Sequence, residues 1–263
     1  MDFYRKGGLL VKKYIGLKMS FRSIPYNMIK TIFLDAGNTL VSMDFSWLAK
    51  ELERFDIICT VRELCRAEAA ARPLVSSELK RLKSTENKQT SVFYMQSILK
   101  GLKATVEMEV KKRDEIVKHM LTTISSSGQN QRLWTYILPG VPDALEILKK
   151  NGYQLGVVSN SNGTVEEILL KLKLRQYFDH VFDSHLVGLE KPDPLFFRHA
   201  LKTANASPDT SLHIGDIYHV DVLGAWNADI YAILLDPFGD WDGYDCPRFP
   251  DLLSFAKMME DIK

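Results

Sequence analysis

The pattern of hydrophobic and polar positions changes character along the chain. Residues 31–34 form a short apolar run, rich in residues that favour strands, which ends on Asp35 and is followed by the turn residues Gly37 and Asn38. This pattern predicts a buried strand that carries an acidic side chain at its carboxyl end. From about residue 139 onward, strand-like runs alternate with stretches whose apolar residues have helical spacing.

The alternation in the second half of the chain predicts an α/β fold. Strands are predicted at 153–158, 180–182, 211–214 and 230–235, and helices at 141–150, 164–172, 194–203 and 221–227. Such alternation implies a parallel sheet with helices on both of its faces. Sheets of this kind bind ligands outside the carboxyl ends of their strands, so we expect the functional site there.

Residues from about 44 to 134 follow a different pattern. Their apolar residues recur with helical spacing among many Lys, Glu and Arg residues. Pro73 and the polar stretch 84–90 are expected to break this helical part into pieces, and 125–131 are expected to form a loop that returns the chain to the sheet. We therefore predict an all-helical insert within the α/β fold.

Composition excludes several classes of function. Basic and acidic residues nearly cancel, with a net charge of +1 at pH 7, so no overall field attracts nucleic acid or an anionic membrane. Cys59, Cys65 and Cys246 are too few and too scattered for a disulfide framework or a zinc site, which favours a reducing, cytoplasmic setting. No apolar run approaches the roughly 20 residues that a membrane-spanning helix requires. We expect neither a nucleic-acid nor a membrane partner.

The first 27 residues form a basic segment in which Asp2 is the only acid. Lysines interrupt the apolar stretch that a secretory signal would need, whereas a basic presequence for an organelle stays open. The simpler interpretation is an N-terminal extension, because the segment that leads into the first predicted strand begins only at Met28.

Four polar clusters follow predicted strands, where a parallel sheet would place an active site. They are residues 35–39 (Asp-Ala-Gly-Asn-Thr), Ser159-Asn160, Lys191-Pro192, and Gly215-Asp216 followed by Asp221. Each cluster alone is weak evidence, because Asp and Ser are ordinary turn residues after strands. Their order and their shared position at the ends of strands point to one site.

The same clusters resemble the four sequence motifs of the haloacid dehalogenase superfamily of hydrolases. The matching segments are Phe-Leu-Asp-Ala-Gly-Asn-Thr-Leu-Val around Asp35, Val-Val-Ser-Asn around Ser159, Gly-Leu-Glu-Lys-Pro-Asp-Pro around Lys191, and His-Ile-Gly-Asp-Ile-Tyr-His-Val-Asp around Asp216. They occur in the family's order. The resemblance implies a Rossmann-like core at 28–43 and 137–263, with a helical cap domain at 44–136 between the first and second motifs.

Carried over to this sequence, the resemblance implies that Asp35 is the nucleophile. Ser159 would hydrogen-bond the transferred group and Lys191 would offset its negative charge. Thr39 and Asn160 would help to bind the substrate, although Thr39 could equally cap the following segment and Asn160 could merely shape its turn.

The resemblance also implies a Mg²⁺ cofactor. Asp35, Asp216 and the carbonyl oxygen of Gly37 would bind the ion, and Asp221 would support the metal site. The chemistry is consistent with this assignment, because a carboxylate that attacks a phosphoryl group needs a cation and fixed donors nearby. Mg²⁺ prefers oxygen ligands, so no cysteine or histidine is required.

Gly37 departs from the family's pattern. Phosphatases of the family normally carry a second Asp at this position, which protonates the leaving alcohol and later activates water. General acid–base assistance is worth about 10²- to 10⁴-fold, so a phosphatase without it should be slow on unactivated alkyl phosphates. We favour a phosphohydrolase of a small phosphorylated metabolite that forms an aspartyl-phosphate at Asp35. Its leaving group would need little protonation, or an insert residue or water would take over.

Three alternatives stay open. A 2-haloacid dehalogenase needs no acid at Gly37, because halide leaves as an anion, but it has no use for the metal site that Asp216 and Asp221 preserve. A phosphonate-cleaving hydrolase would form a Schiff base with a lysine of the insert. The candidate lysines are Lys80, Lys83, Lys88, Lys100 and Lys103. The third alternative is a weakly active relative that binds a phosphorylated ligand or a protein partner.

The insert is expected to determine the substrate and to exclude water from the covalent intermediate. Trp47, Arg72, Phe93 and Tyr94 could line its inner face, but aromatic residues at helical spacing more often pack a domain's own core. The substrate is therefore not predicted beyond a small phosphorylated molecule, and the protein is expected to be a monomer or a homodimer.

Overall fold

The computed structural model describes residues 23–125 and 134–262. Most of the predicted N-terminal extension, 1–27, and of the predicted loop, 125–131, lies outside the described residues. The part of the extension that is described packs on the sheet, because Ile24 is buried there and a 3₁₀ turn, η2 (Tyr26–Met28), follows it.

A parallel sheet forms the core of the described structure, with strand order β5-β4-β1-β6-β7-β8. Its strands are β1 (Thr31–Leu34), β4 (Gln154–Ser159), β5 (His180–Asp183), β6 (Ser211–Gly215), β7 (Tyr231–Leu235) and β8 (Arg248–Phe249). From β1 the chain proceeds to β4 and β5 on one side and then returns to β6, β7 and β8 on the other. The reversal makes the carboxyl end of β1 the point at which doubly wound sheets bind ligands. The predicted α/β class is confirmed.

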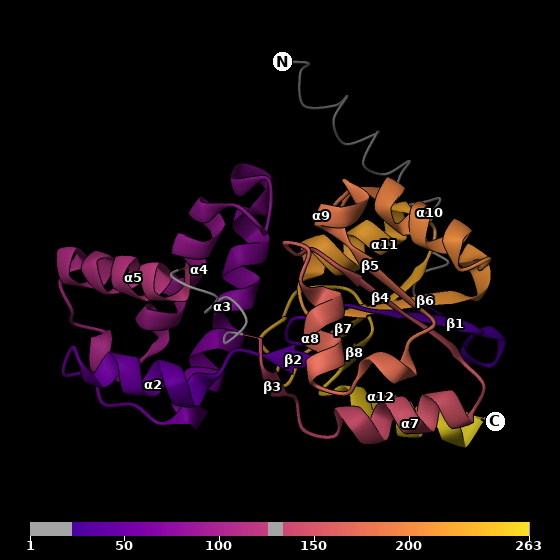
Figure 1. Cartoon of the computed structure of the whole chain (residues 1–263), viewed down its shortest axis with the longest axis horizontal. Coiled ribbons are helices and arrows are strands. Elements are labelled where there is room, and N and C mark those ends of the chain that lie inside the picture. The colour runs from indigo at the N-terminus through magenta and orange to yellow at the C-terminus, as the bar shows by residue number, and fades with distance from the viewer. Residues whose placement is uncertain (1–22, 126–133, 263) are drawn as a thin grey trace, which may run out of the picture.

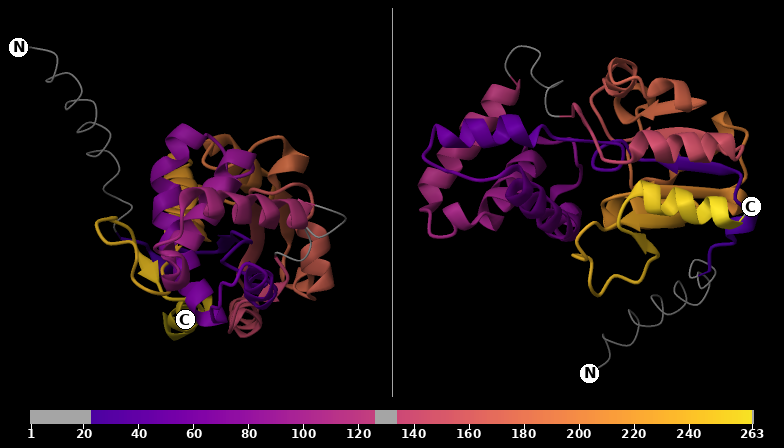
Figure 2. Two further views of the ribbon diagram at one scale, coloured as in Figure 1. Left: turned by 90° about the vertical axis from the view of Figure 1, so that its left-hand side faces the viewer. Right: turned by 90° about the horizontal axis from the view of Figure 1, so that it is seen from below.

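Helices cover both faces of this sheet (Figure 1), as the alternating pattern predicted. One face packs against α7 (Val141–Lys150), α8 (Val165–Lys171) and α12 (Leu252–Ile262), and the other against α10 (Pro194–Thr203) and α11 (Leu223–Asn227). Figure 2 shows α7 and α12 side by side. Short turns join these elements: α9 (Ser184–Val187), η4 (Arg175–Tyr177), η5 (Pro208–Thr210) and the π-helical turn η6 (Tyr218–Val222). Burial on both faces explains the nearly continuous apolar strands.

The helical insert, defined as α2 to α5, lies beside the sheet (Figures 1 and 2). Its helices are α2 (Phe45–Glu53), α3 (Val61–Leu82), α4 (Lys88–Gly101) and α5 (Val110–Ser125), with the 3₁₀ turn η3 (Lys103–Thr105). The chain leaves the sheet through β2 (Val41–Ser42) and returns through β3 (Tyr136–Ile137), and these two strands pair antiparallel. The insert packs around its own apolar cluster, which includes Leu48, Leu64, Ile98 and Met120.

The prediction that Pro73 breaks the helical part is wrong, because α3 continues through it. Proline in a helix interior costs about 3 kcal/mol through the lost hydrogen bond and the clash with the preceding turn. Here α3 buries a long face against α4, including Ala71, Val75 and Leu79. Packing of that face outweighs the local cost. The break predicted at 84–90 does exist, between Leu82 and Lys88.

Candidate active site

Four predicted site residues meet at the carboxyl ends of the central strands. Asp35 directly follows β1, and its N–H donates to the carbonyl oxygen of Ile214 in β6 at 2.9 Å. Ser159 ends β4, Asp216 follows β6, and Lys191 lies between α9 and α10. The side chains are buried, as expected for groups at the switch point of the sheet.

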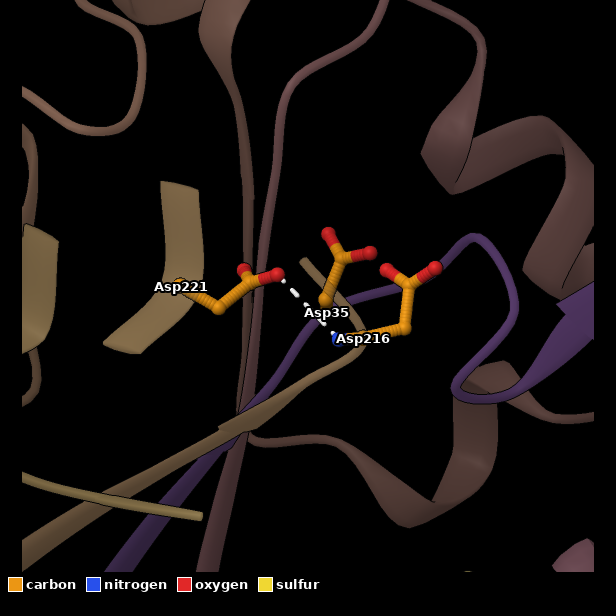
Figure 3. A group of neighbouring side chains, drawn as sticks. All are labelled: Asp35, Asp216 and Asp221. Carbon is orange, nitrogen blue, oxygen red and sulfur yellow. Dashed lines mark hydrogen bonds between the residues drawn. The ribbon is translucent and has the colours of Figure 1, made fainter. Parts of the chain in front are cut away.

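The three predicted carboxylates come together in this site. Asp35, Asp216 and Asp221 each place a carboxylate oxygen within 4.8 Å of the others (Figure 3). The ammonium group of Lys191 is buried between two of them, with Nζ at 2.7 Å from Asp35 Oδ1 and 2.7 Å from Asp221 Oδ1. Figure 3 shows that the carboxylates of Asp35 and Asp216 lie next to each other. Lys191 therefore bonds two of the three carboxylates.

Asp221 holds the loop rather than pointing freely into the site. Its Oδ2 accepts the backbone N–H groups of Asp216 at 3.2 Å and Ile217 at 2.9 Å. Its Oδ1 accepts from Lys191 and lies 3.0 Å from His213 Nε2, which must carry a proton to donate to a carboxylate. A Cβ atom on Gly215 would lie 2.2 Å from Asp221 Cγ, so glycine is required before Asp216.

All three carboxylates are buried, and their neighbouring charged groups give them different pKa values. For Asp221, burial would raise the pKa, but Lys191 and His213 outweigh it and lower the pKa, so the group stays ionised. Burial raises the pKa of Asp35, and Lys191 offsets only part of the rise. Burial also raises the pKa of Asp216 well above its ordinary value, and Arg72, with Nε 3.5 Å from Asp216 Oδ2, offsets only part of the rise. Asp35 and Asp216 are therefore short of positive charge, and an oxygen-only donor set of this kind fits Mg²⁺.

The loop after Asp35 is tightly wound. The carbonyl oxygen of Ala36 accepts the N–H groups of Leu40 at 2.9 Å and Val41 at 3.1 Å. Asn38 has a φ of 51°, in the left-handed region that favours glycine. A Cβ atom on Gly37 would lie 3.3 Å from the indole ring of Trp134, so the ring partly fills the space that a side chain there would need.

The remaining predicted residues differ in their surroundings. Thr39 is buried, and its Oγ1 makes no hydrogen bond to any described residue. Ser159 Oγ has only a long contact of 3.4 Å with the carbonyl oxygen of Asn160. Asn160 instead holds the backbone of Lys191: its Oδ1 accepts the Lys191 N–H at 2.7 Å and its Nδ2 donates to the Lys191 carbonyl oxygen at 2.8 Å. Among the described residues, the buried hydroxyl groups of Thr39 and Ser159 thus make no short hydrogen bond, whereas Asn160 is already engaged.

The insert adds polar groups that the sequence motifs did not reveal. Glu68 and Arg72 of α3 form a buried pair, with Arg72 Nε 2.8 Å from Glu68 Oε1 and Arg72 Nη2 2.6 Å from Glu68 Oε2. The Tyr94 hydroxyl of α4 donates to Glu68 Oε1. Asn38 Nδ2 lies 3.1 Å from Glu68 Oε1 and 3.1 Å from Asp216 Oδ2. The insert therefore directly contacts the loop that follows Asp35.

One sequence signal for this contact was visible. Residues 68–72 read Glu-Ala-Ala-Ala-Arg, which places opposite charges four residues apart on a helix otherwise lined with small residues. Small neighbours allow close helix packing and hence burial of the pair. Arg72 and Tyr94, two of the residues that could line the inner face of the insert, do contact Asp216 and Asn38, whereas Asn38 itself carries no comparable signal.

Further polar contacts join the insert to the sheet. They are Arg66 with Asp240 at 2.6 Å, the Ser76 hydroxyl with the His219 N–H at 3.0 Å, Ser84 with Glu190 at 2.9 Å, and Thr85 with Asn160 at 3.0 Å. Val75 and Leu79 of α3 pack against Val220 of η6. By contrast, the insert lysines considered for a Schiff base, Lys80, Lys83, Lys88, Lys100 and Lys103, are all exposed.

The family assignment follows from comparison with known sequences. The sequence model of the haloacid dehalogenase-like hydrolases matches residues 29–229. The chain belongs to this family. The resemblance noted from the four motifs is thereby confirmed, and this haloacid dehalogenase-like protein is a member of a family of hydrolases.

Curated relatives resemble parts of this family member. It is 39% identical over 99 residues to haloacid dehalogenase-like hydrolase domain-containing protein 3 of Mus musculus, covering 38% of this chain and 39% of that protein. It is 33% identical over 132 residues to the glyceraldehyde 3-phosphate phosphatase of Pyrococcus furiosus, covering 46% of this chain and 55% of that protein. The chain thus spans less than two thirds of the length of either relative.

Solved structures share the fold over most of the chain. A HAD-hydrolase of Bacillus subtilis, solved bound to magnesium, has a TM-score of 0.59 at 17% identity and covers 88% of this chain and 98% of that one. A 2-haloacid dehalogenase of Pseudomonas syringae has a TM-score of 0.52 at 22% identity and covers 89% and 100%. At such identities the likeness shows the fold alone. Among the described helices, none has both the length and the apolar character needed to span a membrane.

Proposed function

We propose that this protein is a Mg²⁺-dependent phosphohydrolase that acts on a small phosphorylated metabolite through an aspartyl-phosphate at Asp35. The observation that carries the proposal is the buried cluster of Asp35, Asp216 and Asp221 beside Lys191 at the switch point of the sheet. A relative named as a glyceraldehyde 3-phosphate phosphatase supports a phosphorylated substrate. A halide displacement would not require the cation that Asp35 and Asp216 call for.

In the proposed reaction, a carboxylate oxygen of Asp35 attacks the phosphorus atom of the substrate, and the bond from phosphorus to the leaving oxygen breaks with its electron pair on that oxygen. Lys191 fixes the Asp35 carboxylate through its 2.7 Å hydrogen bond and offsets the negative charge of the incoming phosphoryl group. Thr39 and Ser159 donate to phosphoryl oxygens, and Asn160 serves by holding the Lys191 backbone. Water then hydrolyses the aspartyl-phosphate and restores Asp35.

The proposed metal ligands are Asp35, Asp216 and the Gly37 carbonyl oxygen, while Asp221 shapes the loop that carries Asp216. When bound, Mg²⁺ would neutralise phosphoryl charge and orient the group for attack. We assign the helical insert, within 44–136, the role of a cap that covers the site, and 28–43 and 137–263 the role of the catalytic core. The small-molecule substrate, the cytoplasmic location and a monomeric or homodimeric state are parts of the same proposal.

Two alternatives lose support on specific grounds. Schiff-base chemistry on a phosphonate requires a lysine at the site, and the candidate lysines of the insert are exposed. A purely ligand-binding protein would have no need for a buried Asp35 carboxylate held by Lys191 at the switch point of the sheet. We therefore retain the phosphohydrolase as the function to be tested.

The decisive experiment measures phosphate release from a panel of phosphorylated metabolites and aryl phosphates, with Mg²⁺ present and then chelated. We expect turnover that requires Mg²⁺ and falls by at least about 10³-fold in Asp35→Asn, because the nucleophile is lost. Mass spectrometry of acid-quenched enzyme should detect a phosphate adduct at Asp35. Metal-independent turnover of 2-haloacids, or ligand binding that Asp35→Asn retains without any adduct, would overturn the proposal.

A further inference from the structure

The helical insert contributes one cation to the catalytic site. Two of its cationic side chains are buried, Arg72 and Arg113. Arg113 donates to backbone carbonyl oxygens of Thr105 and Met108 and so belongs to the insert's own interior. Arg72 instead reaches the core, with Nε 3.5 Å from Asp216 Oδ2. It is thus the buried insert cation, among the described residues, that meets the catalytic carboxylates.

Arg72 is held rigidly in this position. Glu68 pairs with it through both carboxylate oxygens, in the fork-like geometry that fixes a guanidinium group. The Tyr94 hydroxyl and Asn38 Nδ2 both donate to Glu68 Oε1 and so hold that carboxylate in place. Burial would lower the pKa of Arg72, but Glu68 outweighs it and raises the pKa, so the charge is permanent. The guanidinium group has N–H donors beyond those that Glu68 receives.

The two cations of the site come from different sides. Lys191 belongs to the core and bonds Asp35 and Asp221. Arg72 comes from the insert, which covers the site. In-line displacement places the leaving group opposite the attacking Asp35 oxygen, and we take the insert to lie on that side. Gly37 supplies no acid on that side, and the ring of Trp134 lies against it.

We infer that Arg72 stabilises the leaving group as an anion and thereby takes the place of the proton donor absent at Gly37. This inference rests on the phosphohydrolase proposed above and extends it to the substrate class. The preferred substrates are phosphates whose leaving oxygen departs unprotonated, such as a mixed anhydride of phosphate with a carboxylic acid. A fixed cation in a buried site stabilises developing negative charge more strongly than water does.

The proposed step balances without a general acid. An Asp35 oxygen forms a bond to phosphorus while the bond from phosphorus to the leaving oxygen breaks, and the electron pair stays on that oxygen. The anion faces Arg72 and takes any proton it needs from solvent after it departs. Water then attacks the phosphorus of the aspartyl-phosphate, which releases phosphate, a proton to solvent and the Asp35 carboxylate.

The test is the dependence of kcat/KM on the leaving-group pKa in a series of phenyl phosphates that carry electron-withdrawing substituents. Replacing Arg72 alone would leave Glu68 buried and unpaired and could unfold the insert. The double variant Glu68→Gln/Arg72→Gln avoids this, and Glu68→Gln alone, in which Arg72 keeps Asp216 as a charged partner, serves as its reference. Relative to that reference, we expect a loss of about 10²-fold or more for the poorest leaving groups and under about 10-fold for the best.

The variant Glu68→Gln/Arg72→Lys retains a positive charge. It should therefore recover part of the kcat/KM that the double Gln variant loses with poor leaving groups. The matched control is Glu78→Gln/Arg81→Gln, because this pair lies on the same helix at 2.7 Å but is exposed, and its slope should equal that of wild type. Equal losses for every leaving group would assign Arg72 a purely structural role and overturn the inference. Absence of any Mg²⁺-dependent turnover in the wild type would instead overturn the proposed function itself.

Discussion

The indole ring of Trp134 lies against Gly37 in the candidate site. A Cβ atom on Gly37 would meet the indole ring at 3.3 Å, closer than ordinary van der Waals contact. The ring is partly buried between the clusters of the sheet and the insert, so it can shift only slightly. A side chain at position 37 therefore requires the indole ring to move by a few tenths of an ångström.

The substitution Gly37→Asp tests whether only an acid is missing. We expect it to raise turnover of alkyl phosphates by up to about 10-fold, below the usual worth of a general acid because Trp134 crowds the new side chain. Aryl phosphates, whose leaving groups need little protonation, should gain less. Steady-state kinetics on matched alkyl and aryl phosphates measure the difference, and Gly37→Ala controls for the added Cβ atom. Equal gains on both substrate types would contradict the acid–base explanation.

The local sequence was enough to predict where some site residues lie, but not others. Asp35, Ser159 and Asp216 each lie at or just after the end of a strand, so strand prediction alone placed them at one edge of the sheet. Asn38 could not be assigned a contact with the insert, and Tyr94 was only one of several candidates for the inner face, because both depend on how the insert packs on the loop after Asp35. No hydrophobic period in the sequence indicates how the insert packs against that loop.

Among the secondary-structure elements, α3 shows most clearly how tertiary packing overrides local preference. Pro73 lacks the N–H that an interior helix position needs, yet the helix runs to Leu82. Core strands and helices with a clear hydrophobic period were predicted to within a few residues. β8, which has two residues, is too short to show a period, and the π-helical turn η6 depends on Asp221 reaching back to the loop at Asp216.

Replacement of Pro73 by alanine tests how much the proline lowers the free energy of unfolding. We expect Pro73→Ala to raise the free energy of unfolding by about 1–3 kcal/mol, because alanine restores the backbone hydrogen bond and removes the ring clash. Urea denaturation followed by circular dichroism measures the change. The matched control is Pro194→Ala at the first turn of α10, where proline is well tolerated and removal should gain nothing. If the two variants shift stability equally, strain at Pro73 is not the cause.

For the molecule as a whole, the proposed catalysis depends on contact between two separately packed units. The helical insert and the sheet each have an apolar cluster of their own, and most of the groups that join them are polar. Polar contacts of this kind can break and re-form at low cost. The arrangement therefore suits an insert that opens to admit substrate and closes before chemistry.

Arg66 and Asp240 provide the best place to test closure without touching the site. Arg66 of α3 forms two hydrogen bonds, of 2.8 and 2.6 Å, to Asp240 in the segment after β7, and its guanidinium lies 5.2 Å from the centre of the Phe238 ring. The Arg66 side chain is 48% exposed, so solvent screens the pair and its worth is about 0.5–1 kcal/mol.

We expect Arg66→Gln to raise KM about 2- to 5-fold with kcat nearly unchanged, because the closed arrangement becomes less populated before substrate is committed. The effect should shrink at about 1 M salt, where the Debye length falls to about 3 Å. A double-mutant cycle with Asp240→Asn isolates the pair, and Arg62→Gln, an exposed arginine one turn earlier on α3, controls for lost charge. Strictly additive single effects, or a KM that rises as much in Arg62→Gln, would show that this pair does not hold the insert closed.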